Sequence, residues 1–398
     1  MRILFSADLH FGSSDHVSRI NPATGFSTRL EDFLATFEQI VAYAVDPAQQ
    51  IDLVVLAGDI YKTRQPTNTQ QSEFAKRLKS LSDAGIPTTI INGNHDILVS
   101  HGSAATSEIY ASLKVPNVDI KSKPALGVYG DVYILYMPFA HRGKLGLSTN
   151  EELCKWYCDK VRKFVKYADE KDARAKIVVG HQTLEGTTLL SGIHDLKKTS
   201  ELIIPLDVFE GTDFVLYGHI HRYQVLKQNP YIVIPGSMDT LDFAEAEESK
   251  GFIVYDTNTK SAKRIPLRTK PLVHLKFVFD SETDPAIVTN TILAQICDTP
   301  LLPDTIIKVN IDIPESLNAH LDLHAIEDQM GQAAFALRPI VNIKRAKRLR
   351  NETITEALPV EKTLEEFFRE REDVADILDD ILLTGRTIIA TTQTDKVL

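Results

Sequence analysis

Short apolar runs alternate with amphipathic stretches through the first hundred residues of the chain. Runs at residues 2–7, 51–57 and 87–92 have the length of buried strands, and polar residues follow each run at once. Between the runs, apolar residues recur at helical spacing over 30–44 and 74–81. Because predicted strands and helices alternate, the pattern indicates an α/β layered domain.

The middle of the chain is richer in predicted strands, and a small new unit begins near residues 269–271. In the middle we predict strands at 132–137, 176–180, 214–218, 231–234, 251–255 and 263–266, and a helix at 151–168. In the small unit we predict strands at 272–279, 305–313 and 339–343, and helices at 286–296 and 323–335. The resulting division is a first domain at 1–268, a small α+β domain at 269–345, a basic linker at 346–359 and a helical tail at 360–398.

Composition and charge narrow the class of protein. The chain has 398 residues, of which 43% are apolar and 25% charged, as in folded proteins of more than one domain. The longest apolar run, about 133–140, is far short of the ~20 residues that span a bilayer, and the early charge at Asp8 argues against a signal peptide. Three cysteines are too few for a disulfide framework. We therefore expect a cytoplasmic protein without a membrane partner. Its net charge of −10 argues against a protein that binds nucleic acid non-specifically through an overall positive charge.

Five of the predicted strands end in Asp, His or Asn. The residues at these ends are Asp8 and His10, Asp59, Asn94 and His95, His181, and finally His219 and His221. Ligand sites of open α/β sheets collect at the carboxyl ends of strands, so we expect these residues to meet at one edge of a sheet. Nitrogen and oxygen ligands together suit divalent Mn, Fe or Zn and do not suit a thiolate site.

The number of ligands fits two metal ions that share one carboxylate. Asp59 is the best candidate for the bridge, because it stands alone at its strand end after Gly58. Two ions ~3.5–4 Å apart can generate hydroxide at neutral pH and hold both oxygens of an in-line phosphoryl displacement. The other histidines are interpreted as surface or ordinary polar residues: His16, His101, His141, His194, His274, His320 and His324.

Taken in order, these motifs resemble a known signature. Asp8-x-His10, Gly58-Asp59, Gly93-Asn94-His95-Asp96, Gly180-His181 and Gly218-His219-x-His221 look like the calcineurin-like metallophosphoesterase pattern. The stretches at 225–229, 235–237 and 242–251 are similar to the SbcD / meiotic-recombination-eleven family of double-strand-break repair nucleases. The resemblance implies an αββα sandwich, then a small α+β capping domain and a C-terminal helix-loop-helix.

The same resemblance implies two Mn ions and a role for each motif residue. One ion would be held by Asp8, His10 and His221, the other by Asn94, His181 and His219, with Asp59 bridging them. His95 would face the scissile phosphate, either to stabilise its charge or to protonate the leaving oxygen. Asp96, adjacent in the chain, would orient His95. Fe or Mg are alternatives to Mn.

The implied activity is Mn-dependent DNA cleavage, as a 3'-5' double-strand exonuclease and a single-strand endonuclease. Several family members carry a second active-site histidine where this chain has Lys62, which leaves the balance between the two activities open. Another calcineurin-like phosphodiesterase is the alternative enzyme, although Ser/Thr phosphatases would read Gly-Asn-His-Glu and not Gly93-Asn94-His95-Asp96. A scaffold that has lost its metals is the alternative outside enzymes, although every ligand position is filled.

Three partners follow from the resemblance and the tail. DNA ends, single strands and hairpins would be substrates at the nucleoid, and a homodimer would form through helices at 69–84 and 103–113. Within the acidic tail, Leu364, Phe367 and Phe368 share one helical face. A second apolar face follows a predicted break at 371–373, formed by Val374, Ile377, Leu378, Ile381 and Leu382. These faces could fold back on the small α+β domain, but we expect them to dock in a groove of a partner, and the resemblance implies that this partner is an SbcC-type coiled-coil ATPase. The basic run at 344–350 is either a solvated linker or a contact for DNA or a partner.

Overall fold

The computed structural model of the chain describes residues 1–12, 17–97, 104–188, 202–300, 304–344, 358–369 and 377–394. The chain divides into two compact units. The first consists of Met1–Phe279, Thr283–Asp312 and His320–Asn342, and the second of Asp280–Glu282, Ile313–Ala319 and Ile343–Leu398. Each unit is described by itself.

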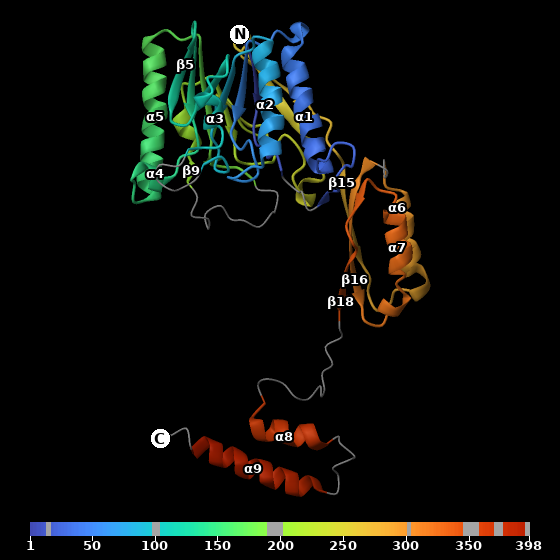
Figure 1. Cartoon of the computed structure of the whole chain (residues 1–398). Coiled ribbons are helices and arrows are strands. Elements are labelled where there is room, and N and C mark those ends of the chain that lie inside the picture. The colour runs from blue at the N-terminus through green and yellow to red at the C-terminus, as the bar shows by residue number, and fades with distance from the viewer. Residues whose placement is uncertain are drawn as a thin grey trace. The chain divides into compact units, whose positions relative to one another are not determined.

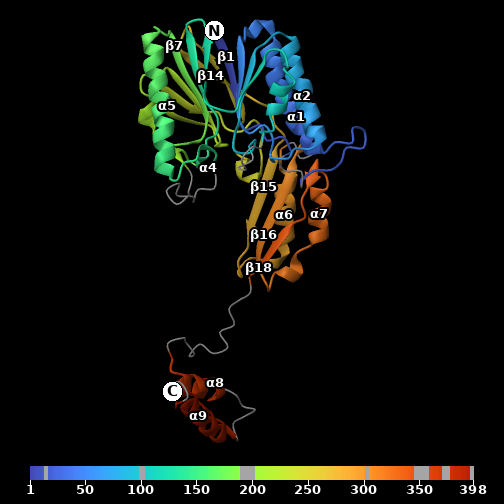
Figure 2. The same ribbon diagram turned by 60° about the vertical axis from the view of Figure 1, so that its left-hand side comes forward.

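Two six-stranded sheets form the centre of the first unit (Figures 1 and 2). One has the order β14-β13-β1-β2-β3-β4 and the other β11-β12-β10-β7-β6-β5. The strands of the first are β1 Arg2–Ser6, β2 Leu53–Ala57, β3 Thr88–Ile91, β4 Val118–Lys121, β13 Gly251–Asp256 and β14 Ser261–Pro266. Those of the second are β5 Ala125–Tyr129, β6 Val132–Met137, β7 Ala175–His181, β10 Phe214–Gly218, β11 Gln224–Gln228 and β12 Tyr231–Ile234. The strands β1 to β4 run parallel to one another, as do β6, β7, β10 and β12, so their carboxyl ends share one edge in each sheet.

Helices cover the outer faces of the two sheets. Figures 1 and 2 show α1 (Thr28–Val45) and α2 (Asn68–Asp83) on one side and α5 (Asn150–Glu170) on the other. Between the sheets, the buried rings of Phe5 and Phe214 lie with centroids 5.2 Å apart. Full burial of such a side chain stabilises a fold by roughly 1.5–3 kcal/mol. The layers therefore follow the order α, β, β, α, and the predicted α/β fold class is confirmed.

Six short strands of the described residues and one topological detail were not predicted from the sequence. The short strands β4, β5 and β11 are only partly buried, so their apolar signal is weak. The prediction of one sheet edge was wrong, because the polar strand ends belong to two sheets. Short elements complete this region: α3 Glu108–Ser112, α4 Arg142–Leu145, β8 Thr183–Leu184 and β9 Ile203–Ile204.

The small α+β segment after residue 271 has its own sheet. Its strands are β15 Leu272–Val278, β16 Ile306–Pro314, β17 Phe335–Ala336 and β18 Ile340–Lys344, with helices α6 Val288–Cys297 and α7 Leu323–Met330. β16 pairs with the other three strands. The helix predicted at 323–335 is shorter than expected, because Gly331 caps α7 and Phe335 starts β17. A capping role for this segment stays a prediction.

The tail forms two helices within the second unit, α8 (Val360–Arg369) and α9 (Leu378–Thr394). They pack on each other where Leu364 approaches Gly385, and Glu365 pairs with Arg386. No α8 side chain is fully buried. The predicted break at 371–373, Val374 and most of the basic run at 344–350 lie outside the described residues. No helix in the described part of the chain has both the length and the apolar character needed to cross a membrane.

Candidate metal centre

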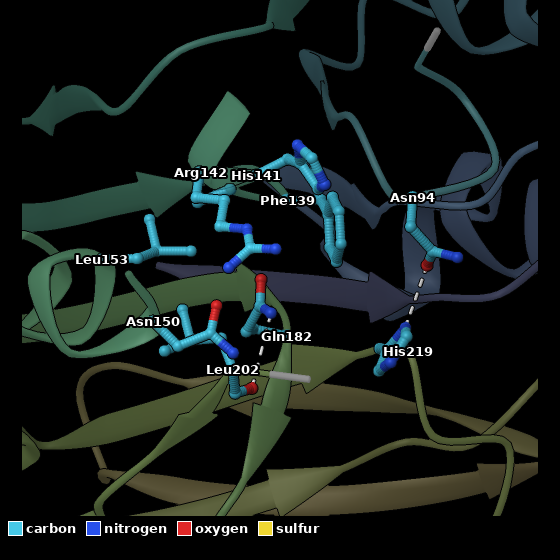
Figure 3. Close-up of a pocket in the computed structure, with 10 residues that line it drawn as sticks. Asn94, Phe139, His141, Arg142, Asn150, Leu153, Gln182, Leu202 and His219 are labelled. Atoms are coloured by element: carbon cyan, nitrogen blue, oxygen red, sulfur yellow. Dashed lines mark hydrogen bonds between the residues drawn. The ribbon is translucent and has the colours of Figure 1, made fainter. Parts of the chain in front are cut away.

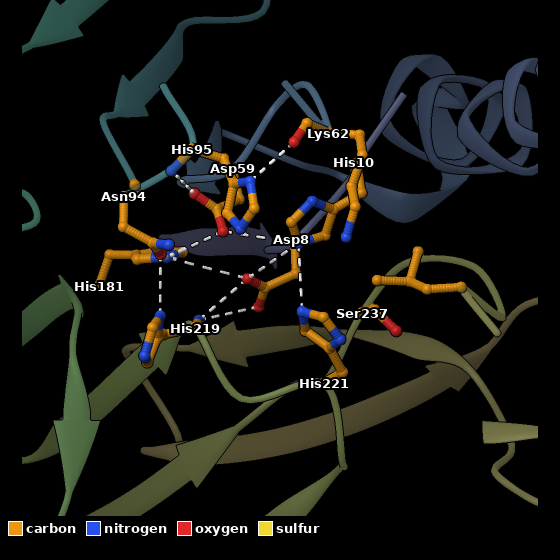
Figure 4. Close-up of polar contacts among 12 residues, drawn as sticks. Asp8, His10, Asp59, Lys62, Asn94, His95, His181, His219, His221 and Ser237 are labelled. Atoms are coloured by element: carbon orange, nitrogen blue, oxygen red, sulfur yellow. Dashed lines mark hydrogen bonds and ion pairs between the residues drawn. The ribbon is translucent and has the colours of Figure 1, made fainter. Parts of the chain in front are cut away.

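The strand ends of the two sheets bring the predicted residues together (Figure 4). The first sheet supplies Asp8 and His10 after β1, Asp59 after β2, and Asn94 and His95 after β3. The second supplies His181 at the end of β7 and His219 and His221 after β10. Because β1 and β2 pack face to face with β7 and β10, the two parallel edges end at the same place. All eight residues meet there.

Four of these residues have a left-handed backbone that side chains other than glycine seldom adopt. The φ angles are 51° at Asp8, 48° at His10, 54° at Asp59 and 98° at His219. Such a conformation costs about 1–3 kcal/mol at each residue and persists only where surrounding contacts fix it. Backbone bonds from Asp8 N to Gly58 O (3.1 Å) and from His10 N to Asp59 O (2.9 Å) provide that support. Strain concentrated at one cluster points to a functional site.

Glycine is required where two of the strand ends touch. A Cβ atom at Gly93 would lie 2.1 Å from Asp59 Oδ1, and one at Gly58 would lie 2.4 Å from His181 Nδ1. Gly58 also has a φ of 93°. Both positions therefore allow a close approach that no other residue permits.

Asp8, His10 and His221 form one group of converging ligand atoms, all within 4.8 Å of one another. The Nε2 atoms of His10 and His221 are 3.1 Å apart, and Asp8 Oδ1 is 4.0 Å from His10 Nε2. Asp8 and His10 are fully buried. These are the three residues that the family resemblance assigns to one ion.

Asn94, His181 and His219 form a second group. Asn94 Oδ1 lies 2.9 Å from His219 Nδ1 and 3.1 Å from His181 Nε2. Between the groups, Asp59 Oδ2 is 3.4 Å from His181 Nε2 and 3.5 Å from His10 Nε2. Asp59 thus faces a histidine of each group, as a bridging carboxylate must.

Hydrogen bonds outside the cluster orient two of the rings. His181 Nδ1 donates to the Ala57 carbonyl (2.7 Å) and His221 Nδ1 donates to Glu245 Oε1 (2.9 Å). In both rings Nε2 is left for a ligand role, since a metal-binding histidine generally donates its other N–H to an oxygen. His10 differs, because its Nδ1 is buried without a hydrogen-bond partner among the described residues.

The charges in the cluster fit divalent cations. Burial raises the pKa of the Asp8 carboxyl, whereas the pKa of the equally buried Asp59 is held below its usual range by His181 and His10. Burial disfavours charge on His181, yet Asp59 and Asp8 raise its pKa to about 9, so this position favours a positive charge. Burial lowers the pKa of His10 and keeps its imidazole neutral, the form that binds metal. Buried carboxylates require paired charge, and this nitrogen and oxygen set suits Mn, Fe or Zn.

His95 lies next to the cluster and is partly exposed. Its backbone N–H donates to Asp59 Oδ1 (2.8 Å), and its Nδ1 donates to the Lys62 carbonyl (2.7 Å). The His95 ring stands edge-on to that of His10, with centroids 5.0 Å apart. A ring nitrogen of His95 also belongs to a group of atoms with His10 and Asp59 within 4.8 Å. His95 therefore lies directly beside the ligand atoms of His10 and Asp59.

Asp96 does not orient His95 as we expected. Its Oδ2 accepts from the backbone N–H groups of Asp59 and Gly93, each at 2.8 Å, and its Oδ1 accepts from Ile60 N at 3.0 Å. Burial, followed by the charge of Asp59, raises the pKa of Asp96 to about 7. Adjacent side chains in a turn point apart, so Asp96 does not hold the His95 ring. The backbone carbonyl of Lys62 holds that ring, while the Asp96 carboxylate links the turns that carry Asp59 and Asn94 through hydrogen bonds to their backbone N–H groups.

Glu245 and Lys250 are parts of the site that the sequence did not reveal. Glu245, at the end of the 3-10 helix Phe243–Glu245, accepts from His221 at Oε1 and from Lys250 Nζ (2.6 Å) and Ser237 Oγ (3.1 Å) at Oε2. Burial would raise the pKa of Glu245, but His221 and Lys250 lower it to about 2. The available signal was the family-like stretch at 242–251, which contains both residues.

The histidines set aside from the sequence do not join the cluster where they are described. His141 lines a neighbouring pocket, and His274, His320 and His324 lie in the small α+β segment. His16, His101 and His194 are outside the described residues.

Comparisons with known proteins identify the family of the chain. The chain matches the family model of the calcineurin-like phosphoesterases over residues 1–223. It is 25% identical to SbcD, a component of the nuclease SbcCD, from Staphylococcus saprophyticus over 70% of this chain and 71% of that protein. It is 24% identical to "Exonuclease subunit 1" of Enterobacteria phage T4 over 80% of this chain and 81% of that protein. It is 23% identical to "DNA double-strand break repair protein Mre11" of Methanopyrus kandleri over 63% of this chain and 51% of that protein. With a family model that covers the strand ends from Asp8 to His221, the chain belongs to the calcineurin-like phosphoesterase family.

Proposed function

We propose that the chain is a Mn-dependent DNA nuclease that hydrolyses phosphodiester bonds at a two-metal centre. The observation that carries the proposal is Asp59 Oδ2, placed 3.4 Å from His181 Nε2 of one ligand group and 3.5 Å from His10 Nε2 of the other. Asp8, His10 and His221 would hold one ion and Asn94, His181 and His219 the other. When bound, such ions supply hydroxide at neutral pH and neutralise charge on the phosphate.

His95 would be the catalytic residue that acts on the phosphate. Its Nδ1–H is used by the Lys62 carbonyl, so Nε2 is left to face the substrate. In its protonated form Nε2 can donate to a phosphate oxygen or give its proton to the leaving oxygen. Asp96 and Glu245 would be positioning residues, because both act through other groups.

DNA is the proposed substrate because the relatives named above are nucleases or a DNA repair protein. Two cations near the centre support it: Lys62 follows Asp59, and the Arg64 guanidinium lies 3.4 Å from the Asn94 carbonyl. Cations at that position can bind DNA phosphates. We propose double-strand exonuclease and single-strand endonuclease activity, in the cytoplasm at the nucleoid.

The deciding experiment combines metal content with cleavage. Purified protein should bind two Mn ions and cut linear DNA only with metal present. His95→Asn should keep both ions and lose most cleavage, whereas Asp59→Ala should lose or scramble both sites. Wild-type cleavage by His95→Asn would contradict the role of His95. Activity on small phosphodiesters without cleavage of DNA would favour the other phosphodiesterases of this family, and metal content near zero would favour a scaffold.

We also propose that the tail binds an SbcC-type coiled-coil ATPase. The helices α8 and α9 leave large apolar side chains exposed, including Phe367 (39%), Leu383 (67%) and Ile388 (57%), and Ile377 (52%) is exposed directly before α9. Amphipathic helices with exposed anchors of this kind bind in grooves of partner proteins. Deletion of the chain after Pro359 should abolish the complex and leave Mn-dependent cleavage of short single strands intact. A truncated protein that still co-purifies with the ATPase at full yield would contradict this assignment.

A homodimer is the last element of the proposal. Of the apolar residues in the two segments predicted to form it, 69–84 and 103–113, Phe74, Leu78 and Leu81 are buried in the core of the chain itself. Ile109 and Leu113 remain, with exposed fractions of 46% and 68%. We propose that these two residues contribute to the contact between copies. Light scattering at micromolar concentration should give a dimer mass that Leu113→Lys lowers, and a monomer mass for the wild type would contradict the contact.

A further inference from the structure

A pocket lies directly beside the proposed metal centre. This pocket has a volume of about 230 Å³ and shares Asn94 and His219 with the second ligand group (Figure 3). Its other walls include Phe139, Arg142 and Gln182. Sites for drug-sized ligands measure ~300–1,000 Å³, so this pocket suits one smaller ring system.

A buried acceptor without a partner lines the pocket. Gln182 is 3% exposed, and its Oε1 has no hydrogen-bond partner among the described residues. Its Nε2 is directed instead at the Leu202 carbonyl, at a long 3.5 Å. An unpaired buried acceptor destabilises a fold, and one that lines a pocket can be satisfied by a donor that enters the pocket. Figure 3 shows Oε1 directed into the pocket, toward the side of Arg142.

An aromatic face connects this acceptor with the metal ligands. The Phe139 ring lies with its centroid 6.1 Å from that of His219 and 6.4 Å from that of His181. The backbone of Phe139 is fixed by a bond from its N–H to the Asn92 carbonyl (2.8 Å). The side chain is only partly buried, so a face remains for contact with a ligand. Arg142, at the start of α4, is exposed and adds a positive charge.

We propose that this pocket binds one nucleobase of the DNA strand, that of a nucleotide next to the phosphate held at the metal centre. The base would stack on Phe139 and donate an N–H to Gln182 Oε1, while Arg142 would contact the next phosphate. Every base has a π-face, so stacking of this kind tolerates any sequence. The inference rests on the proposed nuclease function and adds a base subsite to it.

The test compares an intact oligonucleotide with one that lacks a single base. The full-length protein, with Mn, is given short single strands in which a tetrahydrofuran abasic residue stands on one or the other side of the scissile phosphate. Loss of a stacked base should lower kcat/KM about tenfold at one of the two positions. Gln182→Met and Phe139→Leu should each bring the ratio of intact to abasic kcat/KM toward one. Gln228→Met, the same chemical change at an exposed site, should keep the tenfold ratio.

Direct binding provides a readout that does not depend on cleavage. The fluorescence of an oligonucleotide with 2-aminopurine at the affected position should change on binding without metal, and Phe139→Leu should remove that change. A wild-type ratio near one at both positions, or a ratio that neither variant changes, would overturn the base subsite while leaving the nuclease function intact. Absence of cleavage of both oligonucleotides would overturn the nuclease function itself.

Discussion

Replacement of Glu245 by Gln tests whether the charges of Glu245 and Lys250, which lie behind His221, are energetically coupled. The Glu245 carboxylate is 2.9 Å from His221 Nδ1 and 2.6 Å from Lys250 Nζ. The side chains of Glu245 and Lys250 are 3% and 1% exposed, so water cannot replace a lost partner. In Glu245→Gln the amide N–H₂ would face a donor in either orientation, because His221 donates to one oxygen and Lys250 and Ser237 donate to the other, and the Lys250 ammonium would lose its counter-charge.

The expected magnitude follows from this burial. Removal of one partner from a buried ion pair costs about 3–5 kcal/mol of the free energy of unfolding. Lys250→Met should cost a similar amount, since it leaves the Glu245 carboxylate with one partner fewer. The double variant contains neither charge, so its loss should fall short of the sum by at least about 1 kcal/mol. Urea unfolding of the metal-free proteins measures all three values.

Metal binding gives a second and independent readout of Glu245. Loss of an outer contact to a metal-binding histidine typically weakens metal affinity about 10–100-fold. Calorimetric titration with Mn should therefore show a larger effect for Glu245→Gln than for Lys250→Met, which keeps the bond from His221 to Glu245. Asp83→Asn, which breaks the exposed pair with Lys79, is the matched control and should stay within about 0.5 kcal/mol of the wild type. Additive losses in the double variant, with unchanged Mn affinity, would refute the reasoning.

Three further predictions concern the strand ends, the metals and the thiols. Gly93→Ala should abolish Mn binding, measured by titration, because its Cβ would lie 2.1 Å from Asp59 Oδ1. The control Gly130→Ala, whose Cβ would have no atom within 4 Å, should show only the ~1–2 kcal/mol cost of its left-handed backbone. Normal Mn binding by Gly93→Ala would contradict the predicted steric clash. Mn at 100 times its dissociation constant should raise the free energy of unfolding by about 2.7 kcal/mol per site, and EDTA should reverse the resulting shift in Tm. A Tm that does not respond to Mn would count against the metal centre. Burial and then Cys154 raise the pKa of Cys158 to about 11, so about one thiol in a thousand is ionised at pH 8. Mass spectrometry should therefore show that iodoacetamide labels the exposed Cys297 well before Cys158. Equal labelling rates would show that Cys158 is accessible and ionised.

The sequence alone determined which residues meet at the centre. Asp8, Asp59, Asn94, His181 and His219 each follow an apolar strand, and that local pattern sets both the strand and the position of its end. Parallel strands then place their carboxyl ends at a common edge. The α/β class could be predicted for the same reason, because apolar periodicity is a local property of the chain.

Only the tertiary structure decided what surrounds those residues. The ligands come from two sheets, and nothing in the spacing of the motifs distinguishes two sheets from one. The bond from His95 to the Lys62 carbonyl cannot be read from residue types, since every residue has a carbonyl. Adjacency likewise suggested the wrong task for Asp96, whose carboxylate joins backbone N–H groups 36 and 37 residues away in the chain.

Burial of polar side chains is the property that is hardest to predict from a single sequence. Glu245 and Lys250 look like ordinary members of an acidic surface stretch, yet both are enclosed and paired behind His221. The unpaired Oε1 of Gln182 is visible only once Leu202 and the neighbouring strands exclude water from it. The cost of an enclosed charge or acceptor depends on which distant segments exclude water, so these contacts appear only in the folded chain.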